Sequence, residues 1–456
     1  MGREILSAGI EHKDFIARAT EGLEAYRDSV QSCTLAWAER ETGVPAAAIR
    51  EAAHAYAKAP KAMICWTLGI TEHHNAVDNV LALINLALLT GHVGRWGSGL
   101  NPLRGQNNVQ GGGDMGALPD RLPGFQHVEN APMRRKFEAA WGVRIPPEKG
   151  WHLSAMFEAM ERRELSALYV VGENPAQSEA DQHHALGCLE GLEHLVVQDL
   201  FLTGTARLAD VVLPAAASWC ESEGTVTNSE RRVQRVRKAL DSPGEARDEL
   251  RILFDIAKRL GRDFGPPEAG RVWDELRTLS PVHAGMSYRR LETLGGLQWP
   301  CYDEAHPGEA FLHARLWEGK GPRAPFSVVA HDPPVEGLDA EFPMRLTTGR
   351  RLDDYNTGVQ TSGYASPLRR GETVDLCPSD AARLGFAEGE RIRVRSRRGA
   401  VEAPVRLDPG LRPGLAFMTF HFPDEVATNL VTIDAQDPKS GTAEFKAAAV
   451  RLERIA

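Results

Sequence analysis

Apolar positions recur with helical spacing in the first part of the chain. They predict one amphipathic helix over residues 14–30 and a second that follows Val44-Pro45 and runs to about Ala57. Residues 62–66 are a short apolar run typical of a buried strand. Residues 78–89 follow as a helix that is apolar on most sides, and we expect neighbouring elements to cover it.

The middle of the chain alternates between short β-branched strands and helices. Strands are expected over 168–171, 194–198 and 210–213, with helices over 154–163 and 182–189. This alternation is typical of βαβ units, so we predict an α/β fold with parallel Rossmann-like sheets and helices on both faces. Ligands of such sheets bind beyond the carboxyl ends of the strands. The polar residues expected there are Glu173, Asn174, Asp199, Thr203, Thr205, Glu221 and Glu223.

Residues 266–340 are rich in proline and glycine and are expected to form a long connection. From Phe342 onward the pattern favours strands, over 344–348, 391–396, 400–407, 415–420 and 447–453, with a short helix over 379–384. The sequence therefore predicts a C-terminal β-barrel domain.

Composition narrows the class of protein. The 456 residues are 42% hydrophobic and 25% charged with a net charge of −9, which favours neither nucleic acid nor an anionic membrane as a partner. The six cysteines form no CxxC pair, so no iron–sulfur or zinc motif is present. No signal-peptide pattern or membrane-spanning apolar stretch is found, and we expect a cytoplasmic protein.

A glycine- and amide-rich loop over residues 91–119 is the most unusual segment. Arg104 lies there between Pro102 and Gly105, and Gln106 follows. A guanidinium presents a planar fork that matches a carboxylate or phosphate, and flanking glycines allow a ligand to approach closely. The residues alone leave two interpretations open: an anion site, or an arginine that holds the loop by binding its carbonyls.

The strand-end residues also leave alternatives open. The turn Gly172-Glu173-Asn174-Pro175 is not a dinucleotide fingerprint. Asp199 could accept two parallel hydrogen bonds from a guanine, or it could cap the following helix. The pairs His73-His74 and His183-His184 diverge on any regular element, so no metal site is predicted. The basic run at 231–238 is expected to be a solvated face rather than an anion site.

Several motifs together resemble the molybdopterin oxidoreductase (dimethyl sulfoxide reductase) superfamily, and within it the catalytic alpha subunits of formate dehydrogenases. NPLRGQNNVQG in the glycine loop is specific to formate dehydrogenases. The other matching stretches are 83–91 (LINLALLTG), 171–175 (VGENP), 197–214 (VQDLFLTGTARLADVVLP), 219–232 (WCESEGTVTNSERR) and the tail from 346 (LTTGRR) to 446.

The resemblance implies a molybdenum or tungsten ion held by a bis-molybdopterin guanine dinucleotide cofactor. Formate would be oxidised to carbon dioxide, and electrons would leave through an iron–sulfur cluster to an electron-transfer subunit or an iron–sulfur or flavin partner. Arg104 would bind the formate carboxylate, and Gln106 would contact the pterin. The cofactor-binding residues implied by the resemblance are Gly69, Glu72, Gly105, Gln106, Gly172, Glu173, Asn174, Asp199, Thr203, Arg350, Tyr355, Asn356, Phe420, His421, Asn429, Phe445 and Lys446.

The family's cysteine-rich iron–sulfur domain and its metal-ligating cysteine or selenocysteine have no counterpart in this sequence. We therefore expect the carboxyl-terminal portion of such a subunit, inactive alone and completed by a complementary N-terminal chain or segment. The expected divisions are 1–104, the remaining part of a first α/β pterin-binding domain; 105–265, a second α/β nucleotide-binding domain; 266–340, a connection; and 341–456, a β-barrel molybdopterin dinucleotide-binding domain. Alternatives are another enzyme of the superfamily, such as a nitrate reductase, or a non-catalytic pterin-binding scaffold subunit.

Overall fold

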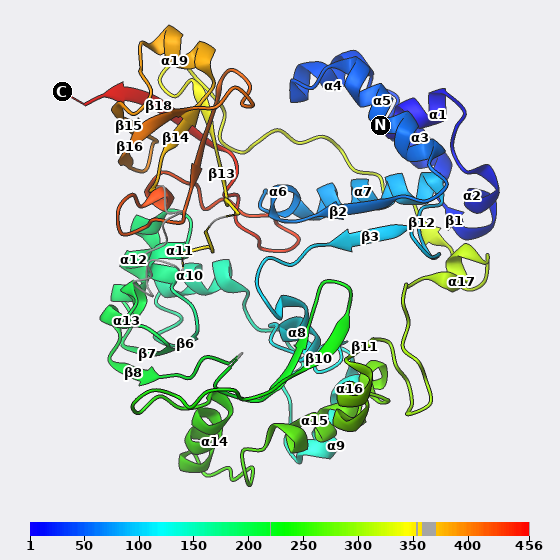
Figure 1. The fold of residues 1–456 in the computed structure, drawn as a ribbon, viewed down its shortest axis with the longest axis vertical. Coiled ribbons are helices and arrows are strands. Elements are labelled where there is room, and N and C mark those ends of the chain that lie inside the picture. Colours follow the sequence, from blue (N-terminus) through cyan, green and yellow to red (C-terminus); the bar gives the residue numbers. More distant parts are fainter. Residues whose placement is uncertain (219, 353, 358–370, 456) are drawn as a thin grey trace.

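The computed structural model describes residues 1–218, 220–352, 354–357 and 371–455. Trp219, which begins one of the stretches above, lies outside them. Figure 1 shows the barrel at the top left, the N-terminal helices at the top right, a parallel sheet on the left and a mixed region at the bottom.

The N-terminal region packs helices around the central helix α7 (Ala76–Thr90). Phe15 and Leu89 are fully buried in this core. The parallel strands β2 (Met63–Trp66) and β3 (Gly99–Pro102) lie beside α7 (Figure 1). The remaining helices are α1 (Gly2–Ser7), α2 (Lys13–Ala19), α3 (Leu23–Ser29), α4 (Leu35–Thr42), α5 (Ala46–Lys58) and α6 (Leu68–Thr71).

The single helix expected over 14–30 is wrong. Two residues between α2 and α3 form β1 (Thr20–Glu21), which pairs in parallel with β12 (Ala324–Pro325). Gly22 then takes a φ of 80°, a left-handed conformation that ends helical geometry. The break is set by a strand that lies far away in the sequence, so local periodicity does not reveal it.

The middle sheet is parallel, as predicted. Its strands are β6 (Ala167–Val171), β7 (His194–Asp199) and β8 (Val211–Pro214). Leu168 and Val170 face a core formed with α10 (Leu153–Glu161), α12 (Gln182–Glu190) and α13 (Gly204–Leu208). Tyr169 and Val171 alternate with them and are 37% and 46% exposed, so this part of the opposite face is open.

The lower region contains the antiparallel strands β9 (Gly224–Thr227), β10 (Arg232–Val236) and β11 (Leu297–Gln298). The basic run at 231–238 is thus largely a strand, and Val233 is fully buried. The segment expected to be a connection contains α15 (Ala269–Leu279), η1 (Pro281–His283), α16 (Tyr288–Leu294), β11, α17 (Ala314–Trp317) and β12. The other elements are α8 (Val109–Asp114), β4 (Arg121–Leu122), β5 (Gln126–His127), α9 (Ala131–Trp141) and α14 (Glu249–Arg259).

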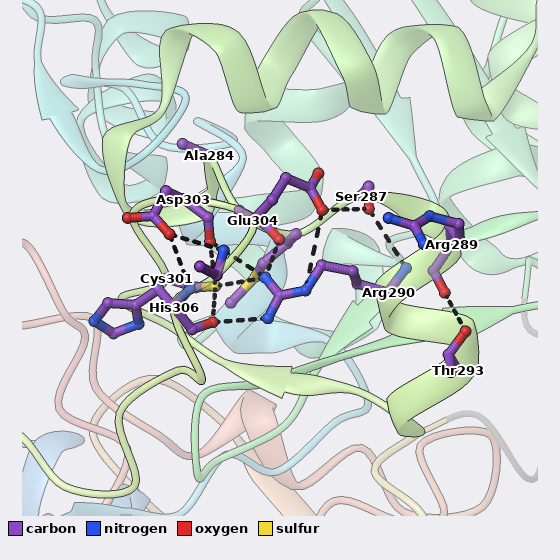
Figure 2. A network of polar contacts seen from close by, with 12 residues as sticks. Ala284, Ser287, Arg289, Arg290, Thr293, Cys301, Asp303, Glu304 and His306 are labelled. Atoms are coloured by element: carbon purple, nitrogen blue, oxygen red, sulfur yellow. Dashed lines mark hydrogen bonds and ion pairs between the residues drawn. The ribbon is translucent and has the colours of Figure 1, made fainter.

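Arg290 organises the loop that follows β11 (Figure 2). Its guanidinium donates to the carbonyl oxygens of Gly285 at 2.5 Å and His306 at 2.7 Å, and to Cys301 Sγ at 3.4 Å. Cys301 is fully buried, and its N–H donates to the carbonyl of Val282. These contacts hold residues 301–306 against α16 and thereby fix the path of the chain just after Trp299.

The predicted C-terminal β-barrel is confirmed. It closes in the order β13-β17-β14-β16-β15-β18, with an apolar interior that includes Leu346, Leu376, Ile392 and Met418. Its elements are β13 (Met344–Gly349), β14 (Val374–Leu376), α19 (Pro378–Leu384), β15 (Arg391–Arg395), β16 (Ala400–Leu407), β17 (Leu415–Thr419), η2 (Thr428–Leu430) and β18 (Ala448–Arg454). Within the described residues, no helix has both the length and the apolar character needed to cross a bilayer.

Candidate functional site

A small cavity lies where the barrel meets the two α/β regions. Its volume is about 80 Å³. Six of its lining residues belong to the predicted cofactor set, although they come from distant parts of the sequence. The lining is Glu72, Ser178, Arg350, Asn356, Thr357, Phe420, Asn429 and Phe445.

A buried ion pair connects the α6–α7 turn to the barrel beside this cavity. Lys446 Nζ lies 3.0 Å from Glu72 Oε2 and donates to the carbonyl of Thr348 at 2.6 Å. Burial lowers the pKa of Lys446, and the Glu72 carboxylate opposes this effect. Arg350 adds a second cation, 3.7 Å from Glu72 and 4.9 Å over the Phe420 ring. Phe420 meets Phe445 edge to face at 6.1 Å.

A second polar contact joins the α6–α7 turn to the barrel domain, and here the turn supplies the basic group and the barrel domain supplies the carboxylate. His74 Nδ1 lies 3.3 Å from Glu444 Oε1, and its Nε2 lies 3.0 Å from Asp332 Oδ2. Burial alone would lower the pKa of His74, but the two carboxylates outweigh it and raise this pKa. No sequence pattern indicates this contact, because its partners are 258 and 370 residues away.

His421 holds the loop after β13. Its Nδ1 lies 2.7 Å from the carbonyl of Asn356, and its Nε2 accepts the N–H of Arg351 at 2.8 Å. A carbonyl only accepts, so Nδ1 carries the proton and the ring is neutral. Burial is the main cause of its lowered pKa. Both ring nitrogens of His421 thus have hydrogen-bond partners within the protein. Tyr355 of the same loop is 54% exposed, and its hydroxyl bonds to the backbone of Asn107.

The predicted residues at the carboxyl ends of β6 and β7 also come together. Asn174 is buried, and its Oδ1 accepts the N–H of Thr205 at 3.0 Å and the Thr205 hydroxyl at 2.9 Å. Thr203 is the N-cap of α13 and accepts the N–H of Ala206. Gly172 ends β6 with a φ of 64°, and a Cβ there would meet no atom within 4 Å. Asn174 and Thr203 shape this strand end, and Glu173 and Asp199 supply its charge.

Three carboxylates, Glu173, Glu179 and Asp199, lie close enough here to affect one another, and no described cation pairs with any of them. The surrounding protein displaces water from Glu173 and raises its pKa, with a smaller contribution from the charge of Asp199. Burial likewise raises the pKa of Asp199. For Glu179, burial followed by the charge of Glu173 raises the pKa to about 7. A group with several N–H donors would relieve this repulsion, and the N–H edge of a guanine is one. The residues present therefore fit a guanine nucleotide at this strand end.

Glu179 provides a test of this electrostatic strain. Its folded-state pKa of about 7 exceeds its ordinary 4.5, so the stability that it contributes is present below pH 4.5 and lost as pH rises through 7. Glu179→Gln should therefore raise the free energy of unfolding by roughly 2–3 kcal/mol at pH 8 and by under about 1 kcal/mol at pH 5. Denaturant melts at both pH values measure this. Glu190→Gln, at an exposed position on α12, is the matched control, and equal gains for both variants would contradict the assignment.

The carboxyl end of the middle sheet adjoins the cavity through residues 177–179. Asn429 Nδ2 donates to the carbonyls of Gln177 and Ser178 at 3.1 and 3.0 Å. Gln177 in turn donates to Asp424 of the barrel at 2.7 Å. Ser178 lines the cavity, and Glu179 follows it in the chain. A single ligand that reached from the cavity to the strand end would thus contact the barrel and the middle sheet together.

The Arg104 side chain lies at the surface of the glycine loop. Its Nε and Nη2 donate to Gln110 Oε1 at 3.2 and 3.0 Å, and its backbone N–H donates to Ser229 Oγ. Gly105 and Gln106 are exposed as well. A Cβ at Gly105 would meet no atom within 4 Å, and the same holds at Gly69 of α6, which follows β2, the strand paired with the loop's β3. A ligand can therefore approach the backbone at both positions. Neither Gln110 nor Glu179 was among the predicted site residues.

Among the described residues, no group of three or more histidine, cysteine, aspartate or glutamate side chains is arranged to hold a metal ion. Any metal at this site would therefore need ligands from a cofactor or from other residues. The side chains described above are suited to bind polar organic groups and anions.

Comparison with known proteins decides the family. Residues 17–259, more than half of the chain, match the family model Molybdopterin oxidoreductase. The chain belongs to the molybdopterin oxidoreductase family. Residues 344–449 match the model Molydopterin dinucleotide binding domain, which coincides with the closed barrel.

Relatives of known name extend the likeness over the whole chain. It is 42% identical over 455 residues to F420-dependent formate dehydrogenase 2 subunit alpha of Methanococcus maripaludis, covering 99% of this chain and 67% of that protein. It is 36% identical to formate dehydrogenase H of Escherichia coli, covering 100% of this chain and 64% of that protein. The solved structure of acetylene hydratase from Pelobacter acetylenicus superposes with a TM-score of 0.71 at 20% identity, over 99% of this chain and 69% of that one. This last match concerns the fold alone.

Proposed function

We propose that this chain is part of the alpha subunit of a molybdopterin-dependent formate dehydrogenase, which oxidises formate to carbon dioxide and passes electrons to an acceptor. One observation carries the proposal: an exposed arginine fork in the NPLRGQNN loop of a chain whose relatives at 36–42% identity are named formate dehydrogenases. A planar guanidinium matches the two oxygens of formate.

The cofactor of this proposal is a bis-molybdopterin guanine dinucleotide with molybdenum or tungsten. Glu72, Arg350, Phe420, Phe445 and Lys446 would hold one pterin at the cavity, and Gly69, Gly105, Gln106 and Tyr355 would border the other side. Glu173, Glu179 and Asp199 would bind a guanine through its N–H groups. Support comes from the polar lining of the cavity and from the cluster of carboxylates beside it, in which the charge of Glu173 helps to raise the pKa of Glu179.

Arg104 has two tasks in the proposed reaction. Formate gives carbon dioxide, a proton and two electrons, and the bound cofactor supplies the two-electron acceptor. Arg104 would hold both formate oxygens, so that the C–H bond points away from the guanidinium. Its positive charge attracts the formate anion. Carbon dioxide is neutral and is not attracted in this way, so the product is released more easily.

The proposed enzyme also contains protein other than this chain. The chain covers 67% of the length of two relatives that are named as alpha subunits. Tyr169 and Val171 leave apolar area uncovered on the middle sheet, and Met63 of β2 is 50% exposed. We expect a complementary α/β segment or chain to cover these strands, and an iron–sulfur or flavin partner to accept the electrons.

The test is formate-dependent reduction of a viologen dye by the anaerobically purified assembly that contains this chain. The proposal predicts carbon dioxide and reduced dye in a 1:2 ratio, because a viologen accepts one electron. An assembly that carries cofactor and reduces nitrate with the dye, yet leaves formate unchanged, would contradict it.

A further inference from the structure

We propose that Gln110, Asp114 and Trp299 form a positioning relay that orients the Arg104 guanidinium and leaves one of its edges free for the formate carboxylate. This inference rests on the proposed function, because it assigns how the same site recognises its substrate. None of the three residues was predicted to belong to the site.

The relay begins at a buried carboxylate. Asp114 ends α8 and is 2% exposed. Its Oδ2 accepts the indole N–H of Trp299 at 2.8 Å, and its Oδ1 accepts the side-chain amide of Gln110 at 2.8 Å. An ionised carboxylate only accepts hydrogen bonds, so both neighbours must turn their donors toward it.

Asp114 thereby fixes the direction of the Gln110 amide. Gln110 and Asp114 are four residues apart on α8 and share one face of the helix. With the NH₂ group of Gln110 on Asp114, its carbonyl oxygen must point the other way, toward Arg104. The reversed amide would present donors to the guanidinium and an acceptor to the carboxylate, losing the hydrogen bonds on both sides.

The side-chain oxygen of Gln110 then binds one edge of the Arg104 guanidinium. It accepts from Nε and Nη2 at 3.2 and 3.0 Å. A guanidinium has five N–H groups, and this contact occupies those on its Nε side. Within the described part of the chain, the pair formed by Nη1 and the second N–H of Nη2 has no hydrogen-bond partner, and these two N–H groups are parallel and spaced for two carboxylate oxygens. The relay thus converts a mobile side chain into a preset fork for a small planar anion.

Trp299 anchors the relay to the rest of the fold. It follows β11, and the Arg290 contacts at Cys301 and His306 hold the next residues (Figure 2). The indole therefore approaches Asp114 from a different region than α8 does. Burial is the main cause of the raised pKa of Asp114, while the hydrogen bonds from Gln110 and Trp299 and the charges of Arg104 and Arg231 oppose this shift.

Asp114→Asn tests the relay because it keeps the volume but adds a donor. If the carbonyl oxygen of the new amide accepts from Trp299, its NH₂ group faces Gln110 and drives that side chain to reverse, which turns donors toward Arg104. We expect the formate Kd, from line broadening of ¹³C-formate in the cofactor-loaded assembly, and KM to rise about tenfold, with kcat changing less than about threefold. Asp380→Asn, at a barrel aspartate that is 3% exposed, is the matched control and should leave formate binding unchanged.

The swap Gln110→Glu/Asp114→Asn separates hydrogen-bond direction from mere packing. The new amide at position 114 can accept from Trp299 and donate to the new carboxylate at position 110. That carboxylate again offers an oxygen to Arg104, and the local charge equals that of the original pair. We expect the double variant to recover formate binding to within about threefold of the original chain. Recovery of thermal stability alone would not produce this result.

Two results would overturn the relay. One is unchanged formate affinity in Asp114→Asn, and the other is a swap variant that binds no better than Asp114→Asn. Failure of the proposed function is separate, since it shows in the unaltered protein: no formate is oxidised although cofactor is present. The relay is judged only by the ratio of variant to original formate Kd.

Discussion

Arg104→Lys should raise the formate KM and lower kcat, with a combined loss of about a hundredfold in kcat/KM, or about 2.7 kcal/mol. Lysine keeps the charge but offers a point donor in place of a planar fork, so formate is attracted and no longer oriented. An ammonium has three N–H groups but no planar edge, so its bond to Gln110 does not set a parallel pair of donors toward formate, as the contacts of Arg104 do.

Steady-state kinetics of the purified assembly, with dye as acceptor, measure this change. Arg162→Lys, at a half-exposed position at the end of α10, is the matched control and should leave both constants unaltered. Cofactor content must be equal in all preparations, so that a loss of rate is not a loss of cofactor. Unchanged kinetics in Arg104→Lys would remove this residue from the substrate site.

Lys446→Met should lower the free energy of unfolding by about 3 kcal/mol, because it leaves the Glu72 carboxylate buried and without its closest cation. Glu72 and Lys446 have side chains that are 9% and 8% exposed, so water compensates little of the loss. Adding Glu72→Gln should recover most of the stability, since the unpaired charge disappears.

A second pair between the same regions provides the comparison. Lys439 contacts Asp78 of α7, but its side chain is 53% exposed. Lys439→Met should cost less than about 1 kcal/mol, because exposed ion pairs contribute little. Denaturant melts of the original chain and the three variants measure the difference. Equal losses for Lys446→Met and Lys439→Met would mean that burial does not govern the Glu72–Lys446 pair.

Local pattern was enough for many of the regular elements. β-Branched strands alternating with helices indicated the parallel middle sheet, and alternation from Phe342 onward indicated the barrel. The helix α15 was missed because proline and glycine dominate the composition around it, although Trp273 and Leu279 are buried on it. The break at Thr20–Glu21 depends on a strand near residue 324, which no local pattern can report.

The site was predictable in part. Resemblance to a family named residues that the fold does bring together, such as Glu72, Arg350, Phe420 and Asn429 around one cavity. Their roles toward a cofactor and those of Arg104 toward formate stay predictions. Gln110 and Asp114 have a helical spacing visible in the sequence, but Trp299 lies 185 residues from Asp114. Likewise, the raised pKa of Glu179 depends on burial and on a neighbouring charge, which only the fold supplies.

The most direct measurement is the content of guanine nucleotide and of molybdenum or tungsten in the assembly that contains this chain, purified anaerobically and denatured to release its ligands. The proposed function predicts one metal ion and two guanine nucleotides per chain, with less nucleotide retained when Glu173 and Asp199 are both changed to alanine. An intact, correctly folded assembly that holds neither metal nor guanine nucleotide would contradict it.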